Sequence, residues 1–399
     1  MNKNRAPLWT KGFILTSSVN FFLVLTFYLL MVTIAVYAVQ EFNASNSEAG
    51  LVTGIFIIGV LTGRIFMGRA IDRIGRKKTM VLGLALFTLT TLFYFLNLGL
   101  PFLMFTRFLH GVTLGIASTA AGTIIAQIIP MSRKGEGIGY FSLSTTLATA
   151  IGPFIGLYMS QNSSFEMIFT LSLILGVASL LVSLFVTVPP IEAPPKIDDT
   201  KGFKISDYIE PKAVPIAVIT FIAGFCYASV LSFISFYADF RELVEAATFF
   251  FLVYSIAILL SRPFTGRLMD VKGANYVMYP AIAIFAAGLL LLSTAQTSST
   301  FLLAGFLIGL GFGNIQSTTQ AVAVKLTPSH RMGLATSTFF IFMDAGLGFG
   351  PYLLGFIISV TGFSQLYAIL SLVAAAMMVL YYLLHGRKEH LANRATTTA

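Results

Sequence analysis

The amino-acid sequence predicts an all-α membrane protein whose twelve membrane-crossing helices form two pseudosymmetric bundles of six. Hydrophobic residues make up 56% of the chain and charged residues only 10%, whereas about a quarter of a soluble domain is charged. Apolar stretches of about twenty residues, the length that crosses about 30 Å of hydrocarbon, recur along the chain. The two halves of the sequence also repeat each other. We therefore expect membrane spans rather than the buried helices of a soluble core.

The apolar stretches define the expected spans. We place them at residues 12–38, 49–68, 79–97, 101–126, 137–160, 165–187, 213–238, 246–265, 275–294, 299–323, 332–359 and 363–384. The first stretch is too long for a cleaved signal peptide and lacks a small-residue cleavage site, so we expect it to remain as the first span. The single cysteine, Cys226, excludes an internal disulfide.

The basic residues lie on one side of these spans. Only Arg241 falls in an expected outer loop and only Arg107 lies well inside a span. Because an excess of Lys and Arg marks the cytosolic side, we expect a multi-pass protein of a bacterial cytoplasmic membrane with both termini in the cytosol. The net charge of +9 then reflects orientation in a lipid bilayer, and a nucleic-acid partner is not expected. We expect the protein to be a monomer.

A hydrophilic, proline-containing stretch separates the two halves. It runs from about Pro189 to Lys212 and carries mixed charges, which is typical of a linker. The sequence therefore predicts an N-terminal six-helix bundle over residues 1–188 and a cytosolic linker over 189–212. A C-terminal six-helix bundle with a short cytosolic tail follows over residues 213–399.

An internal repeat supports this division. A shift of 198 positions places Arg64-x-Phe66-x-Gly68-Arg69-x-x-Asp72-x-x-Gly75 on Arg262-x-Phe264-x-Gly266-Arg267-x-x-Asp270-x-x-Gly273. The same shift aligns Gly111 and Gly115 with Gly309 and Gly313, and Gly152-Pro153 with Gly350-Pro351. Two six-helix halves in the same orientation imply parallel repeats with a substrate path at their interface.

Three motifs carry a family resemblance that covers nearly the whole chain. Residues 68–78 resemble the signature loop between helices 2 and 3 of major facilitator transporters. Residues 107–115 are similar to the helix 4 motif of the proton-coupled members, and residues 152–156 to the helix 5 signature of the twelve-helix drug:proton antiporter branch. The resemblance implies the major facilitator fold and export of a small molecule in exchange for protons. Helix 1 carries no acid, unlike several multidrug members, which disfavours bulky cationic drugs as substrates.

The signature loop suggests a cytosolic gate. A carboxylate at the end of helix 2 is favoured beside a helix N-terminus, and the family implies that Asp72 meets helix 11, which starts near Met332. By pseudosymmetry, Asp270 would meet helix 5 near Gly137. We expect these contacts to close the cytosolic side while the cavity faces outward, with two arginines bracing the first contact. The expected gate residues are Gly68, Asp72, Arg73, Gly75, Arg76 and Asp270.

Two matched prolines suggest helix bending. Each removes a backbone donor inside a span, and nearby glycines permit close helix contact. The expected bending residues are Gly152, Pro153, Gly156, Gly350 and Pro351.

Ionisable residues inside the bilayer are candidates for proton coupling, because their insertion is costly. Asp344 is the only acid that we place deep in a span, and burial and nearby cations shift a carboxyl pKa in opposite directions. Asp344 is therefore the expected proton carrier. His110 is second, because its ordinary pKa lies near 6.5, and Arg107 would compete for a carboxylate partner.

Substrate contacts are expected from polar and aromatic residues of helices 1, 4, 7 and 10. They are Asn20, Tyr28, Gln127, Tyr227, Asn314 and Gln316. The transported compound is a small molecule whose class stays open, including drugs, metallophores and sugar-like metabolites.

The sequence also bears on other functions. The chain has no Gly-Lys dipeptide and hence no phosphate loop of the usual form, and it lacks the common hydrolase motifs, so neither an ATP-driven pump nor an enzyme is expected. No cofactor and no metal site are expected. A proton-coupled uptake symporter is the main alternative to export, followed by a non-transporting membrane receptor.

Overall fold

The computed structural model describes residues 7–44, 46–189, 207–387 and 389. These residues form twelve long helices, each long and apolar enough to cross a membrane, which confirms the predicted fold class. In the first half they are α1 (Lys11–Phe42), α2 (Asn46–Ile74), α3 (Arg76–Leu92), α4 (Leu100–Ile128), α5 (Lys134–Asn162) and α6 (Phe165–Leu184). In the second half they are α7 (Val214–Phe240), α8 (Val244–Lys272), α9 (Asn275–Ser293), α10 (Ser298–Lys325), α11 (Met332–Thr361) and α12 (Phe363–Tyr381).

Short helical segments lie between or after the long ones. Three 3-10 turns, η1 (Phe93–Phe95), η2 (Met131–Arg133) and η4 (Ser329–Arg331), precede α4, α5 and α11, and a π-helical turn, η5 (Tyr382–Gly386), follows α12. Two of the long helices begin at side-chain caps. The Thr10 hydroxyl accepts from the backbone N–H of Phe13, and Thr297 and Thr300 form a reciprocal capping box at α10.

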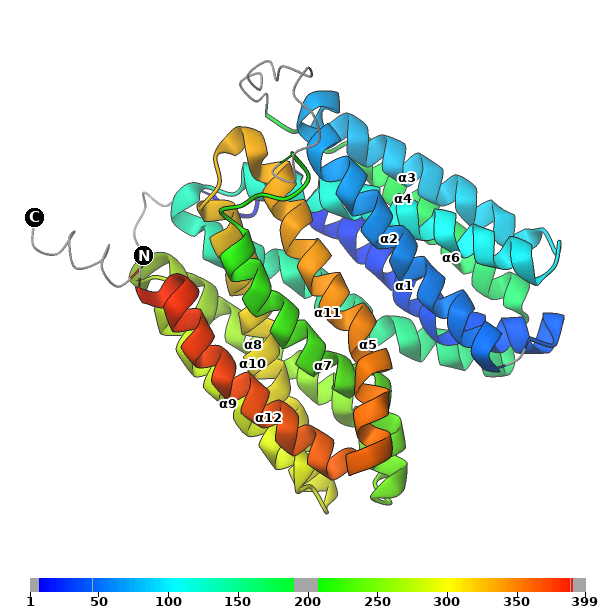
Figure 1. Ribbon diagram of the computed structural model, residues 1–399. Coiled ribbons are helices and arrows are strands. Elements are labelled where there is room, and N and C mark those ends of the chain that lie inside the picture. The colour runs from blue at the N-terminus through cyan, green and yellow to red at the C-terminus, as the bar shows by residue number, and fades with distance from the viewer. Residues whose placement is uncertain (1–6, 45, 190–206, 388, 390–399) are drawn as a thin grey trace, which may run out of the picture. The chain divides into compact units, whose positions relative to one another are not determined.

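The chain divides into two compact units. Unit 1 contains residues 1–130, 144–210 and 328–340, and unit 2 contains residues 131–143, 211–327 and 341–399. Within unit 1, α1, α2, α3, α4 and α6 lie side by side, as do α7, α8, α9, α10 and α12 within unit 2 (Figure 1). The first turns of α5 group with unit 2 and those of α11 with unit 1, so the division does not follow the linker alone.

Glycines let the helices of each unit approach closely. A Cβ atom at Gly111 on α4 would lie 2.1 Å from the Phe56 carbonyl oxygen on α2, and one at Gly309 on α10 would lie 2.4 Å from the Tyr254 carbonyl oxygen on α8. These two glycines are equivalent in the internal repeat. The same close contact therefore joins α2 to α4 in unit 1 and α8 to α10 in unit 2.

The matched prolines lie inside continuous helices. Pro153 lies within α5 and Pro351 within α11, and neither helix is interrupted there. The neighbouring glycines are packed against other helices. A Cβ at Gly156 would lie 2.8 Å from the Leu29 carbonyl oxygen on α1, and one at Gly350 would lie 2.5 Å from the Cβ of Ala228 on α7. The glycines thus serve close packing, and helix bending stays a prediction.

Candidate functional site

The turn between α2 and α3 positions the first group of expected gate residues. Gly75 adopts a φ of +100° between the two helices, a backbone conformation that side chains rarely allow. This turn leaves Asp72 on the last turn of α2 and Arg76 on the first turn of α3. Arg73, between them, is exposed.

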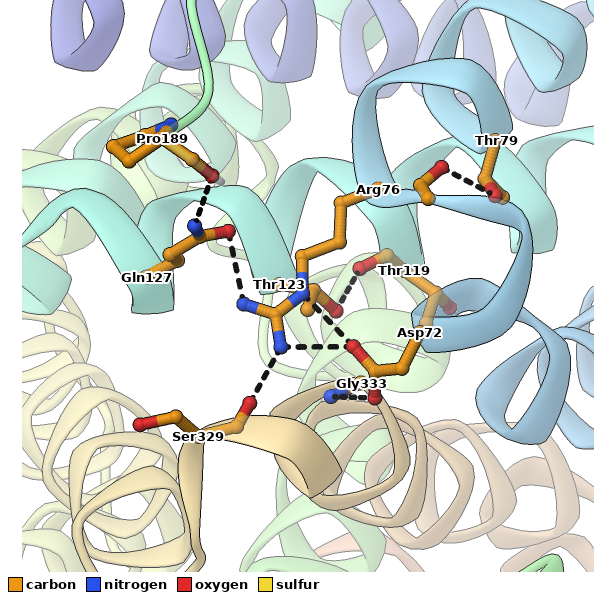
Figure 2. A network of polar contacts seen from close by, with 10 residues as sticks. Asp72, Arg76, Thr79, Thr119, Thr123, Gln127, Pro189, Ser329 and Gly333 are labelled. Atoms are coloured by element: carbon orange, nitrogen blue, oxygen red, sulfur yellow. Dashed lines mark hydrogen bonds and ion pairs between the residues drawn. The ribbon is translucent and has the colours of Figure 1, made fainter. Parts of the chain in front are cut away.

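The carboxylate of Asp72 lies at the N-terminus of α11. Its Oδ2 accepts a hydrogen bond from the backbone N–H of Gly333 at 3.2 Å, and its Oδ1 accepts one from Nε of Arg76 at 2.9 Å (Figure 2). The free N–H groups at a helix N-terminus favour a negative charge. Asp72 therefore ties α2 to the first turn of α11 within unit 1.

Arg76 also contacts the turn before α11 and the end of α4. Its Nη2 donates to the Ser329 carbonyl at 2.6 Å, and its Nη1 donates to Oε1 of Gln127 at 3.0 Å. Gln127 in turn donates to the Pro189 carbonyl at 2.7 Å (Figure 2). Because both ends of the Gln127 amide are used here, we assign this residue to the Asp72 cluster and not to the expected substrate cavity.

Burial and charge act on Asp72 in opposite directions. Burial raises the pKa of Asp72 above its ordinary value, and this is the largest effect. The Arg76 guanidinium, the Gly333 N–H and the nearby His330 oppose the rise without cancelling it. The ionisation of Asp72 thus depends on its burial and on the groups packed around it.

Gly68 lies one turn before Asp72 and brings α2 against α11. A Cβ at this position would lie 2.5 Å from Oγ and 2.6 Å from Cβ of Ser337. Both distances are shorter than real Cβ contacts, so only glycine permits this approach. Gly68 and Asp72 therefore lie on one face of α2, against the first turns of α11, whereas the expected bracing residue Arg73 is exposed.

Asp270 forms the equivalent contact in unit 2. Its two carboxylate oxygens accept from the backbone N–H groups of Gly135 and Glu136, each at 2.8 Å, at the start of α5. Nζ of Lys325 lies 2.9 Å from Oδ1, and the Asp270 side chain is only 2% exposed. The structure thus places both expected carboxylates at the helix N-termini that pseudosymmetry suggested.

The cation beside each carboxylate comes from a different helix. Arg76 on α3 corresponds in the repeat to Ala274, while Gln127 on α4 corresponds to Lys325. The charge has therefore moved from α3 in the first half to α10 in the second. The exchange is visible in the sequence, since the two halves align at both positions.

A second ion pair at α11 was missed from sequence. Nε of Arg331 lies 2.5 Å from Oε2 of Glu210, and the Glu210 backbone N–H donates to the Thr338 hydroxyl at 2.8 Å. The repeat-related Arg133, at the end of η2, instead pairs with Glu136 in the first turn of α5 at 2.8 Å. Because Leu334 on α11 stands at the position equivalent to Glu136, Arg331 pairs instead with Glu210 at the end of the linker.

Arg107 and His110 lie in the core of unit 1. Arg107 is fully buried on α4, donates from Nε to the Val52 carbonyl at 3.2 Å and from Nη1 to the Tyr94 hydroxyl at 3.3 Å. Its guanidinium also lies 4.3 Å from the centre of the Phe56 ring. No carboxylate of the described residues lies within ion-pair distance of Arg107, so the expected competition for a carboxylate has no partner here.

Both ring nitrogens of His110 face hydroxyl groups. Nδ1 lies 3.1 Å from the Tyr94 hydroxyl and Nε2 lies 3.2 Å from the Thr91 hydroxyl. The ring centre is 4.2 Å from that of Phe87. These are the contacts of a histidine that joins α3 to α4, and we retain Asp344 alone as the candidate proton carrier.

Asp344 lies near the middle of α11 and is partly buried. Every other acid in the described helices belongs to a first or last turn. The carbonyl of the preceding residue, Met343, faces Gly224 on α7, where an added Cβ would lie 3.2 Å away. Asp344 therefore lies on a helix segment packed against α7 within unit 2.

The expected substrate residues of the first half join α1 to α5. Nδ2 of Asn20 donates to the hydroxyls of Ser144 at 2.8 Å and Thr145 at 3.1 Å. Tyr28 packs on α5, where an added Cβ at Gly152 would lie 2.7 Å from its Cβ. Both residues thus contribute to the α1–α5 contact within unit 1.

The expected substrate residues of the second half lie on α7 and α10. Tyr227 is buried and stacks against rings from α8 and α10. Asn314 is buried and donates from Nδ2 to the Ser261 hydroxyl at 3.1 Å, while Gln316 is half-buried and donates from Nε2 to Sδ of Met343 at 3.2 Å. These residues lie in the same unit but not in one cluster of contacts.

Known proteins are similar to this chain in sequence and in fold. The family model described as Major Facilitator Superfamily matches residues 16–244 and 243–398. The chain is 26% identical over 400 residues to the uncharacterized MFS-type transporter MJ1560 of Methanocaldococcus jannaschii, covering 96% of this chain and 98% of the relative. It is 23% identical over 340 residues to the multidrug resistance protein MdtL of Escherichia coli, covering 80% and 85%.

The fold also resembles a solved transporter. The crystal structure of the human organic anion transporter MFSD10 superposes with a TM-score of 0.80 at 14% identity, covering 94% of this chain and 100% of that one. At this identity the likeness shows the fold alone. Because the two family-model matches together span most of the sequence, the chain belongs to the Major Facilitator Superfamily and is a secondary transporter.

Proposed function

We propose that this protein exports a small organic molecule across the cytoplasmic membrane in exchange for protons, by alternating access between two six-helix bundles. The observation that carries the proposal is the pair of repeat-related contacts that Asp72 makes with Gly333 and Asp270 makes with Gly135. Each contact ties a helix of one sequence half to the first turn of a helix of the other half. Such contacts are suited to a gate that opens and closes.

The chemistry of the two contacts allows them to break and to form again. Each consists of a carboxylate, one neighbouring cation and backbone N–H groups that become available to water when the helix moves away. A net contribution of about 1.5–3 kcal/mol for hydrogen bonds to charged groups is small enough to be overcome by substrate binding. We therefore propose that Asp72 and Asp270 close the cytosolic side in the outward-facing state and release it in the inward-facing state.

Asp344 is proposed as the proton carrier. A carboxyl away from the helix ends, in an apolar helix, changes its proton affinity when water reaches it from one side or the other. Protonation would remove the charge before the surrounding helices move. This assignment supports coupling to protons rather than to ATP.

The direction of transport is proposed from two observations. One is the Gly152-Pro153 motif on α5, which resembles the antiporter signature, and the other is the similarity to MdtL, whose name describes multidrug resistance. Relatives of this identity differ in substrate. Export is therefore the proposal, and uptake is the outcome that would replace it.

Transport in cells and vesicles tests the proposal. Cells that lack the protein should retain more of a substrate, found by screening antimicrobials and secreted metabolites, and an uncoupler should remove the difference. In proteoliposomes, Asp344→Asn should abolish the dependence of flux on the pH gradient, whereas Asp239→Asn, an exposed acid at the end of α7, should not. Greater accumulation in cells that contain the protein would show uptake instead.

A further inference from the structure

The contact between α2 and α11 extends beyond Asp72 into the membrane. We call it the α2–α11 seam and define it by Arg64, Gly68 and Asp72 on α2, which are four residues apart, and by Gly333, Ser337 and Phe340 on α11. Residues at this spacing share one face of a helix. The outer layer is the Asp72 contact and the middle layer is the close approach at Gly68.

The innermost layer consists of a buried cation and an aromatic ring. The Arg64 guanidinium carbon lies 4.3 Å from the centre of the Phe340 ring, and Arg64 is 5% exposed. The Ser337 hydroxyl donates to the backbone carbonyl of Arg64 at 2.7 Å. The attraction between a cation and an aromatic ring is strongest where water is excluded.

A glycine on α4 makes room for the ring. A Cβ at Gly122 would lie 3.1 Å from Cε2 of Phe340 and 3.0 Å from Cγ2 of Thr336. Both contacts are tighter than ordinary ones. The ring therefore occupies space that a side chain at this position would take.

The repeat-related contact between α8 and α5, in which Asp270 meets Gly135, lacks this layer. We call it the α8–α5 seam. Arg262 is equivalent to Arg64, but the position of Phe340 is taken by Ser142 and that of Gly122 by Gln320. Arg262 donates to the Gly313 carbonyl at 2.9 Å and to the Ser317 hydroxyl on α10, and the second of these contacts corresponds to the 3.4 Å hydrogen bond from Nη1 of Arg64 to the Thr119 hydroxyl on α4. A large ring beside a glycine in one seam is thus exchanged for a small hydroxyl beside a glutamine in the other.

We infer that Arg64 and Phe340 form an inner layer of the cytosolic gate, so that α11 is released more slowly than α5. The inference rests on the proposed gate at Asp72 and Asp270. Release of α11 separates the ring from the buried Arg64 guanidinium. Arg64 keeps its hydrogen bond to Thr119 when α11 is released, just as Arg262 keeps its contacts with α10 when α5 is released, so the ring contact is what distinguishes the two seams. The role of Phe340 is to hold α11 in position by its contact with the Arg64 guanidinium.

Matched cysteine reporters test the order of release. Thr336→Cys on α11 and Ile138→Cys on α5 occupy equivalent positions and are both fully buried. Each is introduced into the full chain with Cys226→Ser and labelled in inside-out vesicles with an impermeant maleimide. We expect the reporter at 138 to react faster than the one at 336. Equal rates, or faster reaction at 336, would overturn the inference.

Substitution of the ring supplies the second measurement. Phe340→Leu should raise the labelling rate at 336 by roughly tenfold, as expected for loss of a desolvated cation–π contact, and leave that at 138 unchanged. Phe340→Tyr keeps the ring and should keep the native rate. If Phe340→Leu leaves the rate at 336 unchanged, the ring does not hold α11.

Moving the ring to the other seam should slow labelling there, a change that misfolding would not produce. Ser142→Phe combined with Gln320→Gly rebuilds the ring beside Arg262 and should slow labelling at 138, and an unchanged rate would count against the inner layer. Asp72→Ala separates the two proposals. If it leaves the 336 rate unchanged, the gate itself fails and the inference falls with it. If it raises the rate while Phe340→Leu does not, only the inner layer fails.

Discussion

The carboxylate of Asp72 lies 3.2 Å from the backbone nitrogen of Gly333, although 261 residues separate them in the chain. Asp270 makes the same kind of contact with Gly135, 135 residues away. In both contacts a carboxylate satisfies an N–H group at the start of a helix, where the helix dipole favours negative charge. The two halves of the protein thus use one interaction at two equivalent places.

Removal of the Asp72 carboxylate should loosen the start of α11. Asp72→Ala leaves the Gly333 N–H and part of Arg76 without an acceptor, a loss of about 1–3 kcal/mol. Asp72→Asn keeps one acceptor oxygen and should have a smaller effect. Maleimide labelling of Thr336→Cys reports the difference, and identical labelling of the Ala, Asn and native proteins would contradict it.

The stability contributed by Asp72 should depend on pH. Because its folded-state pKa is raised, the folded protein binds this proton more tightly than the unfolded chain does. That contribution is fully present below the unfolded pKa of about 3.9 and is lost as the pH rises through the folded-state pKa. The thermal unfolding midpoint of Asp72→Asn, relative to native protein, should therefore increase between about pH 4 and pH 7.

An exposed acid provides the control for this pH dependence. Asp239→Asn changes the same chemical group at the end of α7, where the side chain is exposed. Comparison of the two Asn variants over the same pH range separates the effect of Asp72 from the general effect of removing one carboxylate. A difference for Asp72→Asn that stays constant or shrinks as the pH rises would be inconsistent with the raised pKa.

Gly68→Ala should separate α2 from α11. The added methyl group would meet the Ser337 side chain at 2.5 Å, and such overpacking costs about 1–3 kcal/mol. Gly54→Ala is the matched control, since no atom lies within 4 Å of a Cβ added at this position of the same helix. Transport and thermal stability should fall in the first variant only; equal loss in both would mean that helix propensity, not the seam, is responsible.

The cation beside Asp270 should be transferable between helices. Lys325→Gln removes the charge and should increase labelling of Ile138→Cys. Ala274→Arg added to it reproduces the Arg76 and Gln127 arrangement of the first half and should restore slow labelling. A cavity of about 620 Å³ lined by Ala274 and Lys325 provides room for the arginine. Failure of the arginine to restore the rate would mean that the two carboxylates need different surroundings.

Proton coupling should distinguish Asp344 from His110. His110→Gln keeps hydrogen-bonding groups toward Tyr94 and Thr91 and should leave flux dependent on the pH gradient, even if stability falls. Asp344→Asn should remove that dependence. Measurement of both variants over the same range of pH gradients in proteoliposomes compares them directly. Loss of coupling in His110→Gln alone would transfer the carrier role to the histidine.

Much of the fold was predictable because membrane insertion is a local requirement. A span needs about twenty apolar residues whatever its neighbours are, so apolar length alone located all twelve spans found in the described residues. The internal repeat likewise linked Asp72 with Asp270 before any contact was known. Helix ends were less predictable, since α2 and α8 continue past the apolar stretch as far as Ile74 and Lys272.

The helices, the repeat and the positions of the charged residues can be derived from the sequence, because they depend on composition and spacing along the chain. Which groups meet depends on the folded structure. It placed Gln127 on Arg76, Glu210 on Arg331 and the ring of Phe340 over Arg64. Such partners come from segments far apart in the chain, and a buried polar group accepts whichever partner the packing of the helices brings within hydrogen-bonding distance.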